Sequence, residues 1–515
     1  MNTYLDILNL PNNEYKKDKF TSDILERAEN SFTAIFNNTT YTENGAITNI
    51  SSKDPVLDWF FHGPAMRFAE KDRILELFIK AFKKDPTLAL KVLFYIRDCR
   101  GGQGERNIFR ICLRYLADYE TQWLNNNIGL IPEYGRWDDL WVLLTSKVKD
   151  TVIDFAGSQL AKDLKYYVEN EYQNLSLLGK WMPSENAKDK ERRAQAKILL
   201  ATNKFGSPKN YRKALGMLRK ALKIVEINLA NKDYASIDYA KLPSYAALKY
   251  RMAFQRNDNE HYNEYLQSVK KGEIKINTKT LYPYDILRAY NYTGYGWNHD
   301  NYKVNETLEL QWKNLPDYIP EISGIPVCDT SGSMEGFPIQ VATALSLYIA
   351  EKNKSEIWKN YVIPFSSHAE WKQVIGENIP EKAKSIYTGD CSNTNLQSVF
   401  DLILGRAVAN NIPKDDMPKV LLILSDMEFD ESGNETNFEA IKRKYHEAGY
   451  CLPTLVWWNI ESRNTQVPVT MNDSGNILLS GCSPSCLKIA LSGECDMYKI
   501  MLDIINQPRY EKIKY

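Results

Sequence analysis

The sequence predicts a multidomain fold in which an all-α, helical-repeat half precedes a doubly wound α/β half. From Trp59 to about residue 270, apolar residues recur at helical spacing in many short segments, and strand-like alternation is scarce. From about residue 320, short β-rich apolar runs alternate with helical patterns, which is typical of a mostly parallel sheet. We therefore expect an irregular N-terminal arm at 1–55, a helical domain at 56–315 and an α/β domain at 316–515.

The composition is that of a globular chain with more than one hydrophobic core. The 515 residues are 43% hydrophobic and 25% charged, and 65 basic residues balance 65 acidic ones. Net charge therefore gives no reason to expect nucleic acid or a membrane. Eight dispersed cysteines fit reduced thiols better than a disulfide framework. With no signal peptide and no apolar run near the ~18 residues of a membrane span, we expect a soluble, cytoplasmic protein that binds no membrane. In a chain of viral origin, the virion would be a further location.

The helical half begins with two clear amphipathic segments. In "KDRILELFIKAFKKD" the apolar residues fall on one face of a helix. The next segment, "PTLALKVLFYIRDC", opens at Pro86, and Asp85 is placed to cap it. Further segments of this kind follow with brief connections. They predict stacked helix pairs, although no fixed sequence period emerges.

Two polar stretches interrupt this half. In "YIRDCRGGQGERNIFR" (95–110), three glycines form a turn flanked by arginines and carboxylates. It lacks the G-K-[ST] of a P-loop and the third glycine of a dinucleotide fingerprint. A tight turn held by Arg–carboxylate pairs is favoured over contact with a ligand. In "IPEYGRWDDLWVLL" (131–144), Trp137 is favoured as a core residue over a stacking platform.

A local basic cluster lies between Lys180 and Lys223. It holds thirteen basic and three acidic residues, with Trp181, Phe205 and Tyr211 interleaved. A basic surface with aromatic residues is typical of a nucleic-acid site. A solvated helix face balanced by acidic neighbours explains it equally well. The candidate nucleic-acid-binding residues are Lys188, Lys190, Arg192, Arg193, Lys197, Lys204, Lys209, Arg212, Lys213, Arg219 and Lys220.

In the α/β half, oxygen-bearing side chains follow three predicted strands or loops. The turn "CDTSGSMEG" supplies Asp329, Ser331 and Ser333, the loop "TGDCSNTNLQ" supplies Thr394, and the run "VLLILSD" ends at Asp426. Ligands of parallel α/β sheets bind where the carboxyl ends of the strands converge. Two carboxylates and three hydroxyls suit a hard divalent cation such as Mg²⁺ or Mn²⁺.

Other interpretations of the same residues remain. Ser333 alone could be a helix N-cap, and Asp426 alone a loop residue beyond a strand. A nucleophilic serine is less favoured, because the turn does not spell G-x-S-x-G. Of five histidines, only His368 is placed near the carboxyl edge of the sheet, and we interpret it as a polar loop residue. We therefore predict no catalytic residue, and the five residues as a set favour a metal site.

The motif Asp-Thr-Ser-Gly-Ser, followed by Thr394 and Asp426, resembles the metal-ion-dependent adhesion site (MIDAS) of von Willebrand factor A-type (vWA) domains. The resemblance covers residues 316–515 and implies a Rossmann-like vWA fold. It further implies that Ser331, Ser333 and Thr394 bind Mg²⁺ directly and that Asp329 and Asp426 bind it directly or through water. One metal position would remain for a carboxylate of a protein partner.

A second resemblance rests on "IRDCRGGQGER" and "PEYGRWDDL" ahead of that domain. This order resembles the DUF2828 family, which is similar in layout to the Ro-type (TROVE) RNA-binding proteins. In Ro-type proteins, HEAT-like helical repeats form a ring closed by the A-type domain. RNA binds the basic surface of the ring and its hole.

Three functions follow from these expectations. The first is a non-enzymatic binding protein that holds an acidic group of a protein partner through Mg²⁺. The second is a Ro-like RNA-binding protein that uses the basic cluster, and the two are compatible because they use different halves. A metal-dependent hydrolase is least favoured, because neither a general base nor a second metal cluster is visible.

Overall fold

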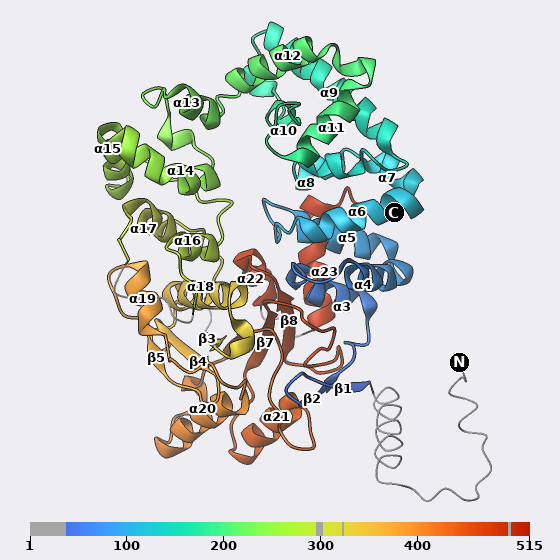
Figure 1. The fold of residues 1–515 in the computed structure, drawn as a ribbon. Helices are drawn as coiled ribbons and strands as arrows, with labels where there is room; N and C mark the ends of the chain where they lie inside the picture. The colour runs from blue at the N-terminus through green and yellow to red at the C-terminus, as the bar shows by residue number, and fades with distance from the viewer. Residues whose placement is uncertain (1–37, 295–301, 322–323, 493–495) are drawn as a thin grey trace, which may run out of the picture.

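In the computed structural model, the described residues are 38–294, 302–321, 324–492 and 496–515. A series of helices forms an arch, and both ends of the arch rest on an α/β half with a parallel sheet (Figure 1). The predicted order of a helical region followed by an α/β region is therefore confirmed. Among the described residues, the helices are too short or too polar to cross a membrane.

The arch consists of helices that pack mainly on their neighbours in the chain. Asp85 accepts a hydrogen bond from the Leu88 backbone N–H at 2.9 Å, so the helix opening at Pro86 is capped as predicted. The helices of the arch are α3 (Pro55–His62), α4 (Lys71–Lys84), α5 (Pro86–Arg97), α6 (Asn107–Tyr119), α7 (Thr121–Asn127), α8 (Leu130–Tyr134), α9 (Lys149–Val168), α10 (Leu178–Trp181), α11 (Lys190–Leu200), α12 (Pro208–Ala221), α13 (Val225–Asn231), α14 (Ser244–Asn257), α15 (Asn259–Lys270), α16 (Pro283–Ala289) and α17 (Glu306–Lys313).

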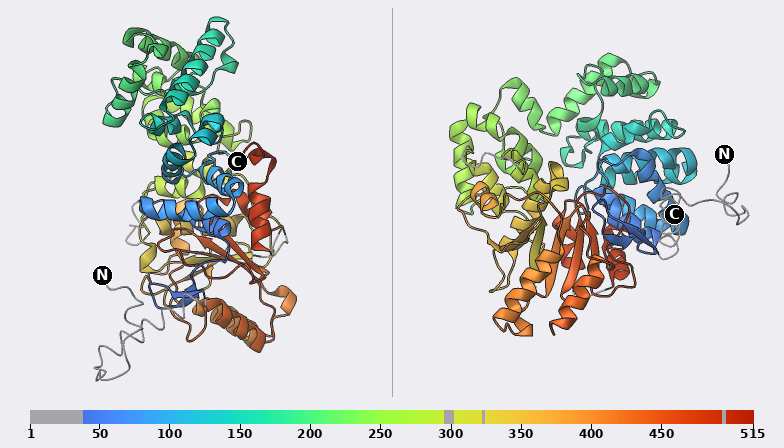
Figure 2. Two further views of the ribbon diagram at one scale, coloured as in Figure 1. Left: turned by 90° about the vertical axis from the view of Figure 1, so that its right-hand side faces the viewer. Right: turned by 60° about the horizontal axis from the view of Figure 1, so that its bottom comes forward.

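The two ends of the arch meet on the α/β half, so the helices and the sheet together form a closed ring (Figures 1 and 2). At the first end, the Arg67 guanidinium lies 4.2 Å from the Phe337 ring centroid and 5.7 Å from that of Tyr284. Phe68 packs edge-on against the same Phe337 ring, with centroids 5.5 Å apart. Tyr284 belongs to α16 at the last end of the arch, and Phe337 begins α18 of the α/β half.

The α/β half contains a six-stranded sheet in the order β5-β4-β3-β6-β7-β8. Neighbouring strands are parallel except β4 and β5, which are antiparallel. The strands are β3 (Gly324–Asp329), β4 (Tyr361–Phe365), β5 (Lys372–Gln373), β6 (Val420–Ser425), β7 (Thr454–Asn459) and β8 (Asn476–Ser480). The helices are α18 (Phe337–Lys352), α19 (Ile379–Ser385), α20 (Gln397–Ala409), α21 (Asn437–Glu447), α22 (Leu487–Ala490) and α23 (Met497–Ile505).

Helices cover both faces of this sheet. α18 and α23 lie on the face toward the arch, and α20 and α21 lie on the other (Figures 1 and 2). Strands covered on both sides need apolar residues throughout, which explains the continuous runs "GIPVC" and "VLLIL". The strand order reverses between β3 and β6. In doubly wound sheets, this switch point is where ligands bind.

The expected irregular arm at 1–55 needs correction. Residues 1–37 lie outside the described part, but β1 (Thr39–Tyr41) and β2 (Ile47–Asn49) form an antiparallel hairpin. The hairpin lies against the α/β half, where the Thr42 hydroxyl donates to the Phe429 carbonyl at 2.7 Å. Three-residue strands show too little alternation to be seen in a sequence, and contacts with distant residues stabilise them.

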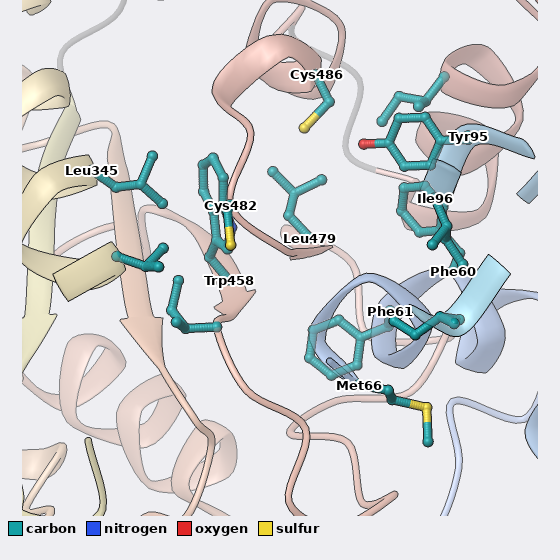
Figure 3. Close-up of a cluster of buried hydrophobic side chains, with 14 of the residues drawn as sticks. Phe60, Phe61, Met66, Tyr95, Ile96, Leu345, Trp458, Leu479, Cys482 and Cys486 are labelled. Carbon is teal, nitrogen blue, oxygen red and sulfur yellow. The ribbon is translucent and has the colours of Figure 1, made fainter. Parts of the chain in front are cut away.

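The two halves share one hydrophobic core. Phe60 and Tyr95 of the arch stack with ring centroids 5.7 Å apart, and they face Leu479, Trp458 and Cys486 of the α/β half (Figure 3). The end of the chain also returns to the arch, as the Tyr134 hydroxyl donates to the Arg509 carbonyl at 2.6 Å. Seven cysteines lie in the described residues, and all are free thiols, as expected.

Candidate metal centre

Two carboxylates lie at the switch point of the sheet. Asp329 is the last residue of β3, and Asp426 follows the last residue of β6. The two strands are neighbours, with Cys328 opposite Leu424. The apolar residues of both strands are buried in the core of the sheet. The two carboxylates follow them and therefore lie side by side at the carboxyl edge of the sheet. Both side chains are buried, with 0% and 2% of their surface exposed.

The Asp329 carboxylate is held by two hydrogen bonds. Its Oδ1 accepts from the Ser331 backbone N–H at 2.9 Å, and its Oδ2 accepts from the Ser425 hydroxyl at 2.5 Å. Burial raises the pKa of this carboxyl, and these hydrogen bonds oppose that rise. The Asp329 carboxylate is therefore fixed in orientation, but both of these donors are neutral groups that do not balance its negative charge.

The two predicted serines face each other. The Ser331 and Ser333 hydroxyl oxygens lie 3.1 Å apart. Ser333 does not cap helix α18, which begins at Phe337 with Gly336 at the N-cap and no side-chain cap bond. Gly336 has a φ of +87°, which a residue with a Cβ rarely adopts. The helix-cap interpretation of Ser333 is therefore wrong.

Asp426 is the least satisfied group of the set. Its Oδ1 accepts from the Glu428 backbone N–H at 3.3 Å. Its buried Oδ2 has no hydrogen-bond partner among the described residues, although Arg463 Nε lies 3.1 Å away. Burial raises the pKa of Asp426, and the nearby Asp329 carboxylate raises it further. Two buried carboxylates with one unpaired oxygen fit a site that receives a cation.

Thr394 lies in the loop that precedes α20. Its backbone N–H donates to Asp430 Oδ2 at 3.2 Å, and its hydroxyl accepts from the Asn44 side chain at 3.4 Å. The same loop lies against the serine turn, because a Cβ added to Gly332 would stand 3.0 Å from the Cys391 carbonyl oxygen. The structure thus brings all five predicted residues to one edge of the sheet.

The donor set consists of oxygen atoms only, which fits Mg²⁺ or Mn²⁺ better than a softer metal. Within the described residues, no three His, Cys, Asp or Glu side chains are grouped to hold a metal ion. A thiolate or imidazole site is therefore not seen there. The candidate centre has two carboxylates and three hydroxyls, and so belongs to a different class of site.

Four residues at this centre were not predicted from the sequence. Ser425 holds Asp329, Asp430 holds the Thr394 loop, Arg463 approaches Asp426, and Asn44 covers Thr394. Ser425 and Asp430 lie close to Asp426 in the chain, so the polar run after "VLLIL" was a usable signal. Arg463 follows β7 at the same carboxyl edge of the sheet, so its position after a strand was also a usable signal. Asn44 comes from a distant segment and carries no such signal. His368 is exposed, in agreement with its interpretation as a loop residue.

The basic cluster lies at the top of the arch, on α10, α11 and α12 (Figure 1). Arg193 and Arg219 donate to backbone carbonyls, while Lys204 and Arg212 pair with Asp154 and Glu185. The remaining seven candidates are exposed and form no ion pair within the described part of the chain. They are Lys188, Lys190, Arg192, Lys197, Lys209, Lys213 and Lys220.

The aromatic residues of the cluster are not free platforms for bases. Tyr211 is buried and donates its hydroxyl to the Pro183 carbonyl at 2.6 Å, and Phe205 is 5% exposed. Trp181 is half-buried beneath the Arg136 guanidinium, which lies 4.5 Å from its ring centroid. This surface could therefore contact a nucleic acid through its positive charges, but not by stacking these aromatic rings on bases.

The glycine turn of the helical half is held by Arg–carboxylate pairs, which is the interpretation that the sequence favoured. Asp139 accepts from Arg97 Nε and Arg110 Nε, each at 2.8 Å, and joins "IRDCRGGQGER" to "YGRWDD". Asp98 accepts from the Arg509 guanidinium, which ties the turn to the end of the chain. A Cβ on Gly102 would stand 2.1 Å from the Tyr95 carbonyl oxygen, so only glycine fits there.

Comparison with known proteins gives two family matches along the chain. Residues 42–155 and 145–323 match the domain of unknown function DUF2828, and residues 323–508 match the domain of unknown function DUF7788. Uncharacterized protein L728 of Acanthamoeba polyphaga mimivirus is 31% identical over 502 residues. That alignment covers 89% of this chain and 85% of the relative.

Among solved structures, the chain is similar to the crystal structure of the Deinococcus radiodurans RO (RSR) protein. It aligns with a TM-score of 0.35 and 13% identity over 88% of this chain and 99% of that chain. That score is too low to establish a shared fold. The match to DUF2828 spans more than half of the chain, and the chain therefore belongs to the DUF2828 family.

Proposed function

We propose that this protein is a non-enzymatic binding protein whose α/β half is a vWA-type domain. Its metal-ion-dependent adhesion site would hold an acidic group of a protein partner through Mg²⁺, or through Mn²⁺ in its place. One observation carries the proposal: Asp329, Asp426, Ser331 and Ser333 meet at the sheet's switch point, and a buried Asp426 oxygen has no hydrogen-bond partner in the described part of the chain.

Each residue of the site would have a separate task. Ser331, Ser333 and Thr394 would contact the cation through their hydroxyls. Asp329, oriented by Ser425, and Asp426 would balance its charge directly or through water. When bound, the cation would supply the positive charge that attracts a carboxylate of the partner.

The proposal assigns no catalytic residue. A metal-dependent hydrolase would need a general base beside the activated water. His368 is exposed, and His62 is fully buried against the Ser462 hydroxyl. We expect no turnover of phosphoesters in the presence of Mg²⁺, and measurable turnover that Asp329→Ala abolishes would contradict a purely binding role.

Direct titration of the full chain with Mn²⁺ tests the site. Asp329→Ala should remove Mn²⁺ binding measured by calorimetry, because the cation loses one of two charged partners. Asp401→Ala is the matched control, since Asp401 is an exposed carboxylate of α20 that pairs with Lys444. Wild-type affinity in Asp329→Ala, with native circular dichroism, would contradict the proposal. Capture of a partner that survives EDTA would contradict the metal bridge.

A second candidate function, RNA binding, is favoured by a different observation. Seven exposed basic side chains on α11, α12 and the segment before α11 form no ion pair with any described residue, and they concentrate positive charge at the top of the arch. Such a surface would neutralise phosphates and release counterions, so affinity would fall steeply as salt rises.

Charge removal tests this second candidate. Lys197→Gln, Lys213→Gln and Lys220→Gln combined should weaken binding of a single-stranded oligouridine at low salt. The slope of log K against log salt should fall in magnitude by up to about 2. The matched control removes three exposed lysines of α4, namely Lys71, Lys83 and Lys84. Equal oligouridine affinity in both triple variants would count against this surface.

A further inference from the structure

A cationic side chain of the protein reaches into the candidate metal centre. Arg463 Nε lies 3.1 Å from Asp426 Oδ2, and Arg463 Nη2 donates to the Ser333 carbonyl oxygen. The Arg463 side chain is 35% exposed, so it approaches the buried carboxylate from the solvent side. The guanidinium therefore contacts two of the five residues predicted to hold a cation.

The backbone around Arg463 is held by the arch. Arg73 of α4 donates to the carbonyl oxygens of Ser462, Arg463 and Asn464. The Ser462 backbone N–H donates to the Ala65 carbonyl at 3.0 Å, next to the first end of the arch. The loop that carries Arg463 is thus clamped from the helical half. Its side chain is the part that can move without breaking these bonds.

A second carboxylate lies on the outer side of the guanidinium. Glu43 Oε2, at the tip of the β1–β2 hairpin, is 4.0 Å from Arg463 Nη1 and half exposed. Asn464 Nδ2 donates to both Glu43 Oε1 at 3.2 Å and Glu428 Oε1 at 2.9 Å. Arg463 therefore stands between Asp426 on the inside and Glu43 on the outside, and leaving the first would bring it closer to the second.

The inner contact is a loose one. Arg463 Nε and Asp426 Oδ2 are within ion-pair distance, yet neither atom has a hydrogen-bond partner among the described residues. A buried carboxylate needs a nearby positive charge, and a guanidinium supplies one charge where a divalent cation supplies two. Both would use the same Asp426 oxygen, so they exclude each other.

We infer that Arg463 is a built-in competitor of the cation: its guanidinium neutralises Asp426 until a divalent cation displaces it toward Glu43. This inference rests on the proposed cation site. The metal affinity of the site then depends on competition between the Arg463 guanidinium and the metal ion for the Asp426 carboxylate. Arg73 of the arch influences that balance through the loop it clamps.

Mn²⁺ titration of the full chain by calorimetry tests the competition. Arg463→Gln should bind Mn²⁺ about tenfold more tightly than the wild type, equal to about 1.4 kcal/mol, because the competing charge is gone. Arg463→Lys keeps the charge and should stay near the wild type. Arg443→Gln is the matched control for loss of one positive charge, because Arg443 of α21 pairs with Glu435 and Glu447.

A chemical rescue separates direct occupancy from a general charge effect. In Arg463→Ala, guanidinium chloride below denaturing concentrations should weaken Mn²⁺ binding competitively, because the free ion enters the vacated place. The same addition should leave the wild type almost unchanged, since its own guanidinium already stands there. A guanidinium effect of equal size in both proteins would overturn the inference.

The outcomes distinguish this inference from the function on which it rests. Mn²⁺ binding that Asp329→Ala abolishes but Arg463→Gln does not tighten would overturn the competitor and leave the cation site standing. No Mn²⁺ binding in either the wild type or Arg463→Gln would overturn both. Tighter binding in Arg463→Gln, with Arg443→Gln unchanged, would support both.

Discussion

Single buried polar residues show how the two halves are joined. His62, the last residue of α3, is fully buried, and its Nδ1 lies 2.9 Å from the Ser462 hydroxyl. Burial and the Arg73 guanidinium lower the pKa of His62 to about 3. The folded protein therefore keeps this imidazole neutral, whereas the unfolded chain protonates it near pH 6.5.

His62 predicts acid sensitivity with a definite sign. Because the unfolded state binds the proton more tightly, stability falls as the pH drops below about 6.5 toward 3. Between pH 7 and 5, the free energy of unfolding should fall by about 2 kcal/mol more in the wild type than in His62→Gln. Urea unfolding at both pH values measures this. His446→Gln, at an exposed position on α21, should keep the wild-type difference.

At the scale of elements, the glycine turn 101–104 acts as a joint between α5, α6 and the end of the chain. Gln103 Oε1 accepts a hydrogen bond from the Ser483 backbone N–H at 3.0 Å. Gln103 Nε2 donates to the Tyr95 hydroxyl at 2.7 Å. Its neighbour Gly102 lies against the Tyr95 carbonyl oxygen. The turn can make these contacts only while its backbone passes close to α5.

Replacing Gly102 with Ala should therefore be strongly destabilising. The added methyl would overlap a backbone atom that cannot move alone, and we expect a loss of at least about 2 kcal/mol in the free energy of unfolding. The matched control is Gly216→Ala in α12, where a Cβ would meet nothing within 4 Å. That variant should be neutral or more stable by up to about 1 kcal/mol. Similar losses in both would show that the close approach is not decisive.

At the scale of the whole molecule, the arch and the sheet share one core. Phe60 and Phe61 of α3 belong to the same buried cluster as Trp458 of β7 and Leu479 of β8 (Figure 3). α3 packs against β8, and α16 packs against α18 at the other end of the arch. Because the two halves share this core, we expect both to unfold in one transition when the core is weakened.

Phe60→Ala tests that expectation. Loss of the buried ring should cost about 3–5 kcal/mol and lower the unfolding midpoint of the whole chain. Circular dichroism and the fluorescence of the tryptophans, which lie in both halves, should shift together. Two separated transitions would instead mean that the halves unfold independently. Phe68→Ala, at a 59% exposed position, should have a smaller effect.

The sequence alone determined the order of the two halves and the residues of the candidate site. Helical and strand patterns are local, so Asp329 and Asp426 could be assigned to strand ends before their positions were known. Topology then brings the ends of neighbouring parallel strands together. That the charges of the glycine turn would form Arg–carboxylate pairs was also predictable from the sequence. Their partners were not, because Arg97 and Arg110 pair with Asp139 of the next polar stretch.

The tertiary structure alone decided what surrounds those residues. The docking of the β1–β2 hairpin on the Thr394 loop and the return of Arg509 to Asp98 each join segments hundreds of residues apart. The approach of Arg463 to Asp426 joins the segments that follow two neighbouring strands. Such pairs leave no periodic pattern, because their stability comes from burial and charge in the folded state rather than from local propensity. The same holds for the basic cluster, where only the structure separates four basic side chains that are already engaged from seven that form no ion pair among the described residues.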